Sequence, residues 1–227
     1  MWERVYHWVP SHSRVCYSQF GEDAILDWLT RECEPGFYVD IGAFHPVYLS
    51  NTYALYLRGW RGIAIEARPE MRNEFELFRP RDITVSCCVG PEDREEATLV
   101  VFEDVVHTTL DPALAARSVA AGEKVRERIT VPVLGINSAL SRWKPEGVRV
   151  DLLSIDVEGL DEAILQAYDF EKYAPRLLVF ERHGTNVEDL ASLPIVQFLK
   201  SQGYSLVTLC GPSVIMRRVA SASDCPC

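Results

Sequence analysis

Carboxylates recur at the ends of the buried strands that the sequence predicts. Asp40 lies near the end of an apolar run at 37–41, Glu66 ends a second run, and Asp156 and Glu181 end two later ones. Ligands of open α/β sheets bind beyond the carboxyl ends of parallel strands, so these side chains are expected around one cleft. Clustered acids repel one another and are costly to desolvate, so four together favour a functional site over a structural one.

These residue types suit a ribose-binding group and an acid–base group. Glu66 could accept both hydroxyls of a ribose, because two carboxylate oxygens match a vicinal diol. Asp156 and Glu181 are expected beyond adjacent strands, and His183 follows on the same loop. Free imidazole has a pKa of about 6.5, which suits a general base at neutral pH. The sequence therefore indicates His183, Asp156 and Glu181 as catalytic residues, with a solvated loop histidine as the alternative interpretation of His183.

A divalent metal is a second possibility at the same place. Asp156 and Glu181, with Glu158 or His183, could supply ligands for Mg²⁺. Such an ion would bind an acceptor oxygen and lower its pKa. No independent ligand spacing supports the metal, so a metal-free site is favoured.

The elements that must position these residues alternate between strands and helices. Runs that are apolar on both faces are typical of a parallel sheet covered by helices, and they lie at 37–41, 62–66, 83–89, 150–156 and 176–181. Helical patterns lie at 21–31, 53–58, 160–167 and 194–203. The segments 204–209 and 213–218 predict a terminal antiparallel hairpin. The pattern predicts an α/β fold.

The segment between the third and fourth strands, 90–149, is long enough for a lid or an insertion. Within it we expect a β-like stretch at 97–102, a helix that starts at Asp111-Pro112, and a solvated helical face for the charged run at 123–128. The whole chain is predicted to be one domain, 1–227, with an N-terminal arm at 1–16, the insertion at 90–149 and a tail at 219–227.

Composition excludes several classes of function. Acidic residues number 33 and basic residues 23, which gives a net charge of −10. Such a field repels phosphate backbones and anionic lipids, so neither a nucleic-acid partner nor a membrane partner is expected. No stretch has the roughly 20 apolar residues of a transmembrane helix, and residues 1–8 lack the apolar part of a signal peptide. We therefore expect a cytoplasmic protein.

A dinucleotide site is the main competitor for the cleft. Such a site favours G-x-G-x-x-G in the first turn, whereas this turn reads Gly-Ala-Phe-His-Pro-Val at 42–47. Pro46 and Val47 stand where glycine could stand, which disfavours an NAD-dependent oxidoreductase.

Four segments resemble the FkbM-type methyltransferases, a family of class I S-adenosylmethionine-dependent enzymes. The similarity extends over most of the chain, and its segments are Ser-Gln-Phe-Gly-Glu-Asp at 18–23, Phe-Tyr-Val-Asp-Ile-Gly-Ala at 37–43, Gly-Ile-Ala-Ile-Glu at 62–66 and Ser-Ile-Asp-Val-Glu-Gly at 154–159. The resemblance implies a Rossmann-like sandwich: a mostly parallel seven-stranded sheet with an antiparallel last strand and helices on both faces.

The resemblance also implies the cofactor and the residues that hold it. S-adenosylmethionine would have its methionine end at Asp40, Gly42 and Ala43, its ribose at Glu66 and its adenine near Cys88. The further cofactor-binding residues are expected to be Ser50, Asn51, Ala67 and Asp156.

The acceptor that the resemblance implies is a hydroxyl on a small molecule, such as a sugar or natural product, or on a glycan. A module of the same fold that binds the cofactor or a nucleotide without catalysis is the alternative, because a fold alone does not establish activity.

Overall fold

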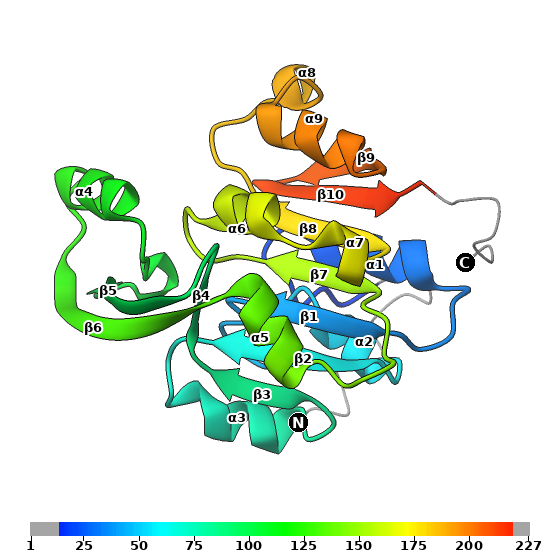
Figure 1. The fold of residues 1–227 in the computed structure, drawn as a ribbon, viewed down its shortest axis with the longest axis horizontal. Coiled ribbons are helices and arrows are strands. Elements are labelled where there is room, and N and C mark those ends of the chain that lie inside the picture. The colour runs from blue at the N-terminus through cyan, green and yellow to red at the C-terminus, as the bar shows by residue number, and fades with distance from the viewer. Residues whose placement is uncertain (1–13, 220–227) are drawn as a thin grey trace.

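The computed structural model describes residues 14–219 and shows an α/β protein with two sheets (Figure 1). The predicted N-terminal segment at 1–16 and the tail at 219–227 lie almost wholly outside the described residues. Within them, the large sheet has seven strands and the small sheet three.

The large sheet has the expected topology. Its strands lie in the order β3 (Ile83–Ser86), β2 (Arg61–Glu66), β1 (Phe37–Ile41), β7 (Leu152–Ile155), β8 (Leu177–Glu181), β10 (Ser213–Arg218) and β9 (Tyr204–Cys210). The first five strands are parallel, and β10 is antiparallel to both of its neighbours. The Rossmann-like fold class with an antiparallel last strand is therefore confirmed.

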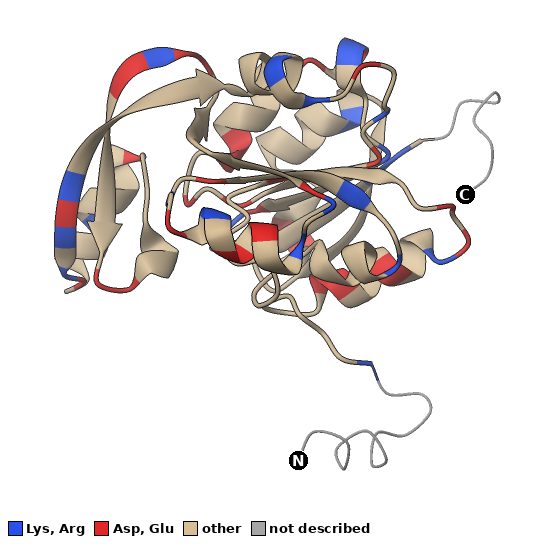
Figure 2. Ribbon diagram, turned by 90° about the horizontal axis from the view of Figure 1, so that it is seen from below, with Lys and Arg blue, Asp and Glu red and all other residues tan. Residues whose placement is uncertain are grey.

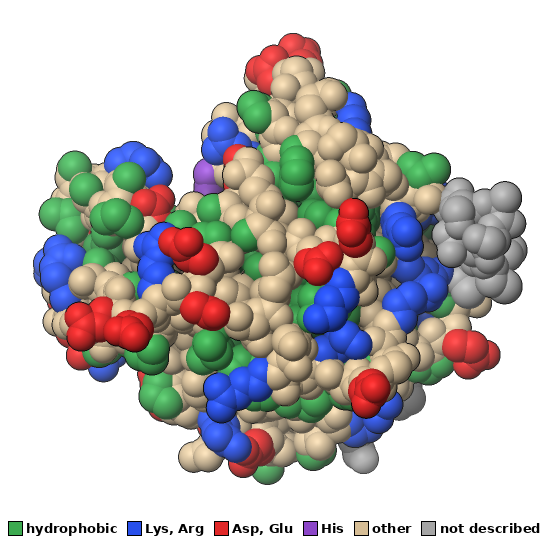
Figure 3. Space-filling view, in the orientation of Figure 1, with side chains coloured by type: hydrophobic (Ala, Val, Ile, Leu, Met, Phe, Trp, Pro, Cys, Tyr) green, Lys and Arg blue, Asp and Glu red, His purple; other side chains and the backbone are tan. Residues whose placement is uncertain are grey.

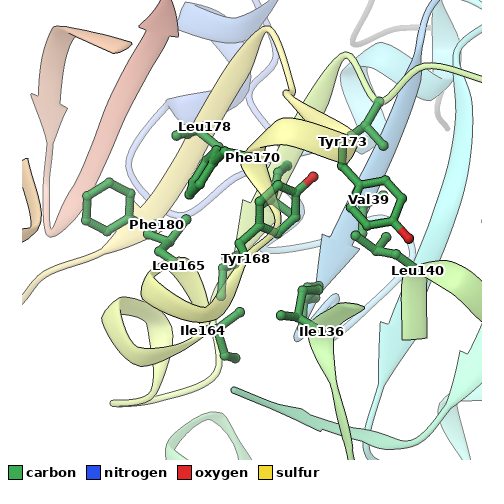
Figure 4. Close-up of a cluster of buried hydrophobic side chains, with 14 of the residues drawn as sticks. Val39, Ile136, Leu140, Ile164, Leu165, Tyr168, Phe170, Tyr173, Leu178 and Phe180 are labelled. Atoms are coloured by element: carbon green, nitrogen blue, oxygen red, sulfur yellow. The ribbon is translucent and has the colours of Figure 1, made fainter. Parts of the chain in front are cut away.

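Alternating side chains of the strands serve two separate cores. Val39 and Ile41 of β1 join the larger core, whereas Tyr38 joins the core on the opposite face, as the two-residue period of a strand requires. Figure 4 shows the larger core gathering side chains from β1, β8 and the covering helices. That face is covered by α5 (Ile136–Trp143), α6 (Asp161–Ala167), α7 (Phe170–Tyr173), α8 (Val187–Leu190) and α9 (Pro194–Ser201). The other face is covered by α1 (Glu22–Thr30), α2 (Tyr53–Leu57) and α3 (Met71–Phe78).

The small sheet projects from one end of the large one (Figure 1). Its strands are β4 (Cys88–Gly90), β6 (Val125–Gly135) and β5 (Arg94–Phe102), and the β5–β6 connection carries the 3₁₀ turn η2 (Val105–His107) and α4 (Pro112–Ala120). This arm, residues 88–135, occupies most of the predicted insertion. The rest of that insertion is not part of the arm, because α5 packs on the large sheet.

The prediction of one strand over 83–89 was wrong. The chain leaves the large sheet after Ser86, and Cys88 begins a strand that pairs with β6 in the small sheet. The side chain of Cys88 packs against Leu99, Val101 and Val133 of the arm. This non-local packing, which a local apolar run does not reveal, breaks the run into two strands.

The prediction of a helical face at 123–128 was also wrong. From Val125 onward these residues form the start of β6, paired with β5 through Val101↔Glu127 and Val100↔Arg128. Figure 2 shows basic and acidic residues alternating along this part of the arm. The charges are solvated as expected, but the strand period continues into the apolar residues Val131 and Val133.

Acidic and basic side chains are interspersed over the face of the molecule in Figure 3. The surplus of acids therefore does not form one field over that face. None of the helices within residues 14–219 is long and apolar enough to cross a membrane.

Candidate active site

A cavity lies where β1, β2, β7 and β8 end, between the large sheet and the arm. The space free of protein atoms between its walls is about 940 Å³, a volume that includes open solvent. One side of the cavity is formed mainly by residues at or just after the ends of those strands, and the opposite side by residues of the arm. The lining includes Gln19, Glu22, Gly42, Phe44, Leu49, Asn51, Glu66, Ala67, Arg68, Cys88, Leu99, Val105, Val106, Thr108, Leu110, Asp156, Glu158, Glu181 and Ser213.

The cavity has an apolar side and an acidic side. Ala67, Cys88, Leu99 and Leu110 form one apolar cluster near the end of β2. Glu181 lies at the end of β8, which β1 and β7 separate from β2 in the sheet. An elongated ligand with one apolar end and one polar end would suit this arrangement.

Three backbone and side-chain N–H groups fix the carboxylate of Glu66. One oxygen accepts the Phe44 N–H at 2.9 Å, and the other accepts the N–H of Arg68 at 3.0 Å and its Nε–H at 2.8 Å. The guanidinium of Arg68 also lies over the ring of Phe44, 4.5 Å from its centroid. Glu66 is therefore held at the cavity wall in one orientation.

Gly42 is required by the protein's own backbone. Its φ is +75°, and a Cβ built there would lie 1.7 Å from the carbonyl oxygen of Asp156. A glycine at such a turn can let a ligand approach the backbone. The structure shows that the group closest to it is the chain after β7, so Gly42 lets the ends of β1 and β7 lie close together.

The arm is anchored on the loop that follows β7. The hydroxyl of Thr109 donates to the carbonyl oxygen of Glu158 at 2.5 Å. Glu158 has a φ of +53°, an unfavourable value for a residue with a side chain, and Gly159 follows at +102°. A Cβ at Gly159 would lie 3.0 Å from the carboxylate of Asp111 at the start of α4. The close contact between arm and loop therefore places the Glu158 side chain in the cavity.

Four carboxylates cluster where β7 and β8 end, and all four have raised pKa values. Burial is the main cause in each case. It raises the pKa of Asp156 well above its usual range, with the charges of Glu181, Asp161 and Glu158 adding to the effect. It raises the pKa of both Glu158 and Asp161 to about 7. The pKa of Glu181 is also raised by burial, although His183 opposes this shift.

His183 lies outside the cavity but contacts a residue that lines it. Its Nε2 is 2.8 Å from a carboxylate oxygen of Glu181, and its side chain is 69% exposed. The donor atoms of Glu158, Glu181 and His183 lie within 4.8 Å of one another, a grouping that could hold a metal ion.

The cavity brings together most of the residues that the sequence indicated, but not all. Those that line it are Gly42, Asn51, Glu66, Ala67, Cys88, Asp156 and Glu181. Those that do not are Asp40, Ala43, Ser50 and His183.

Asp40 departs most clearly from the expected arrangement. Its side chain is buried on the face of the sheet that carries Tyr38 and accepts a hydrogen bond from the hydroxyl of Thr52 at 2.5 Å. The neighbouring Ile41 reaches the cavity instead. The cleft therefore gathers three of the four strand-end carboxylates, because alternate residues of β1 point to opposite faces.

Ala43 and Ser50 support the cavity from behind. Ala43 packs with Ala64 and Phe75 beneath α3. The hydroxyl oxygen of Ser50 accepts the N–H of Tyr53 at 3.2 Å at the start of α2.

Sequence reasoning missed several residues of the cavity wall. Gln19 and Glu22 come from the N-terminal segment that carried part of the family resemblance, so a signal for them existed. Glu22 is 2% exposed and accepts hydrogen bonds from the Phe20 N–H and the hydroxyl of Ser213. For Thr108 in the arm, whose hydroxyl is buried without a hydrogen-bond partner, no sequence motif was available.

The chain matches the model of the methyltransferase FkbM domain over residues 40–206, which is more than half of its length. The chain belongs to the FkbM methyltransferase family. The match begins in β1 and ends in β9, so the FkbM domain includes every strand that ends at the cavity, as well as the arm. No curated protein matches the chain.

Asp161 provides a test of the buried FkbM carboxylate cluster. It is 3% exposed, and its pKa of about 7 lies above the 3.8 of an ordinary Asp. The folded state thus holds this proton more tightly, and its contribution to stability is lost as the pH rises from about 4 through 7. In Asp161→Asn the loss is absent, so the melting temperature of the variant minus that of the wild type should increase by about 2 °C or more between pH 5 and pH 8.

Differential scanning calorimetry at both pH values measures this difference. The control is Glu171→Gln, which changes an exposed residue of α7 and should give the same difference at both pH values. A flat profile for Asp161→Asn would show that Asp161 is charged in the folded protein.

Proposed function

We propose that this protein is an S-adenosylmethionine-dependent O-methyltransferase that acts on a hydroxyl of a sugar, glycan or natural product. Family membership supports methyl transfer. The observation that carries the finer proposal is the charge of the cavity. Among the described residues that line it, the only basic side chain is that of Arg68, whereas five side chains carry carboxylates: Glu22, Glu66, Asp156, Glu158 and Glu181. Such a wall favours a cationic cofactor and a neutral acceptor over phosphorylated ones.

The residues of the cavity fit the cofactor. The apolar cluster of Ala67, Cys88, Leu99 and Leu110 would hold the adenine, and the fixed carboxylate of Glu66 would hold the ribose. The unpartnered hydroxyl of Thr108 offers a further polar contact. When bound, S-adenosylmethionine supplies an electrophilic methyl group on a cationic sulfur.

The task of the protein is to orient the acceptor hydroxyl and take its proton. Glu181 lines the cavity, and its carboxylate is bound to His183 on the outer side. We propose that this pair accepts the proton of the acceptor hydroxyl, because burial raises the pKa of Glu181 and so makes its carboxylate a better base. Asp156 lies beside the pair, and a cation in the cavity would favour its charged form by offsetting the burial and the neighbouring acids that raise its pKa.

Two other functions remain as alternatives to test. A non-catalytic module would bind the cofactor but transfer no methyl group. An NAD-dependent oxidoreductase would have to place a pyrophosphate among five carboxylates. A helix that starts at the first turn would help to bind the phosphates, but α2 begins only at Tyr53, well beyond that turn. The acidic wall disfavours the oxidoreductase.

Glu66→Ala tests the cofactor site. The variant removes a charged hydrogen-bond acceptor, so it should bind S-adenosylhomocysteine about 10- to 100-fold more weakly than the wild type. Isothermal titration calorimetry measures the dissociation constant. Glu70→Ala, which removes an exposed carboxylate four residues along, is the matched control and should bind normally. Binding of NAD by the wild type, without binding of either adenosyl ligand, would overturn the proposal.

His183→Ala tests the proton acceptor. The acceptor molecule is first found by mass spectrometry of candidate hydroxyl compounds incubated with the protein and labelled S-adenosylmethionine. With that acceptor, the variant should lose about 10²- to 10⁴-fold in kcat, the usual contribution of a general base. Its affinity for S-adenosylhomocysteine should be unchanged, because His183 does not line the cavity. Near-normal turnover with intact binding would remove His183 from the mechanism.

Metal dependence is tested with a chelator. We propose a metal-free site, because Glu181 and His183 are already bound to each other at 2.8 Å and Mg²⁺ prefers an all-oxygen set of ligands. Turnover in excess EDTA should equal that in its absence. Loss of turnover, restored by Mg²⁺ or another divalent ion, would instead assign Glu158, Glu181 and His183 as ligands.

A further inference from the structure

Arg79 is a fully buried arginine at the end of α3, away from the cavity. Its guanidinium carbon lies 5.1 Å from the ring centroid of Tyr38 and 5.5 Å from those of Tyr56 and Phe75. Burial of a charge is costly unless it is paired and hydrogen-bonded, so the partners of this side chain indicate what it does.

Three hydrogen-bond partners of Arg79 belong to the loop between β1 and α2, residues 42–52. Its Nη2–H donates to the hydroxyl oxygen of Thr52 at 2.9 Å, and its Nη1–H groups donate to Ser50 at 3.4 Å and to the Pro46 carbonyl at 3.5 Å. A further partner is Asp82, which accepts the Nε–H at 2.7 Å. The guanidinium thus joins this loop to the segment after α3.

The β1–α2 loop lines the cavity in a conformation that needs external support. Phe44, Leu49 and Asn51 reach the cavity wall. Phe44 and Leu49 have φ values of +52° and +54°, which are unfavourable for residues with side chains. Asn51 donates to the hydroxyl of Ser154 at 3.2 Å. Support from the opposite side of the loop comes from Arg79.

The same network is anchored in the sheet. Asp82 accepts the hydroxyl of Tyr38 at 2.7 Å and the N–H of Gly62 at 2.9 Å, so it is tied to β1 and β2. Thr52 donates to the buried carboxylate of Asp40 while accepting from Arg79. The guanidinium therefore lies between two buried carboxylates, that of Asp40 in β1 and that of Asp82, which directly precedes β3, and it links them to the loop.

We propose that Arg79 is a positioning residue that holds the β1–α2 loop in the shape that binds the cofactor, without touching the cofactor itself. This inference rests on the proposed function. A loop that is already in its bound shape loses less conformational entropy when the ligand binds, so affinity increases. A lysine cannot replace arginine here. The planar guanidinium donates to the loop and to Asp82 at the same time, and a single ammonium group cannot do both.

Arg79→Lys tests the proposal, because it keeps the buried positive charge and removes the fork. Its dissociation constant for S-adenosylhomocysteine should rise about tenfold or more, the size of one lost charge-assisted hydrogen bond. Amide hydrogen exchange of the ligand-free variant should be faster at 43–52 than in the wild type. Calorimetric titration and exchange mass spectrometry measure the two effects.

Arg81→Lys is the matched control. The guanidinium of Arg81 lies over the same Tyr56 ring at 3.8 Å, but its hydrogen bond goes to the Tyr56 carbonyl oxygen and not to the loop. Thr52→Val is the second test variant, in case Arg79→Lys does not fold. It keeps the Arg79–Asp82 ion pair and the β-branched shape, and removes the hydroxyl that joins Arg79 to the loop.

The outcomes separate this inference from the proposed function. Weaker binding and faster loop exchange in Arg79→Lys or Thr52→Val, with Arg81→Lys unchanged, support it. A lower melting temperature with binding within twofold of the wild type would show a purely structural role and overturn it. If the wild type binds no adenosyl ligand, the proposed function fails and this inference fails with it.

Discussion

Repulsion among the carboxylates at the ends of β7 and β8 is the constraint around which this site is built. Asp161 accepts the backbone N–H of Glu181, which itself is bound to His183, so each of these two acids has a partner. Asp156 and Glu158 line the cavity, as Glu181 does. Burial and mutual repulsion disfavour the charged forms of these carboxylates, so the cluster destabilises the folded protein. A cation in the cavity would relieve that cost, so the feature that weakens the fold favours ligand binding.

The cavity needs both sheets. The large sheet delivers carboxylates at the carboxyl ends of its strands, together with apolar residues such as Ile41 and Ile65. The arm supplies Leu99 and Leu110 beside Cys88, and Thr109 fastens it to the loop that carries Glu158. The arm therefore completes the apolar side of the cavity and sets the geometry of the acidic side.

The large sheet was predictable from sequence because its strands are short apolar runs whose alternating residues are buried on both faces. The hairpin at the end of the chain had a clear turn at Gly211. The arm was less predictable, since the charged residues of β6 alternate with few apolar ones until Val131. The run at 83–89 was misassigned as one strand, because the partner that draws Cys88 out of the large sheet is more than 40 residues away at Val133.

The sequence by itself determined the strands of the large sheet and their chain order, and that carboxylates lie at or near the ends of several of them. Only the tertiary structure decided which of them share the cavity. Asp40 and Ile41 are neighbours in the chain, yet one binds Thr52 behind the loop and the other reaches the cavity. The reason is physical: a strand presents successive side chains to opposite faces, and packing of helices and of the arm decides which face becomes the site.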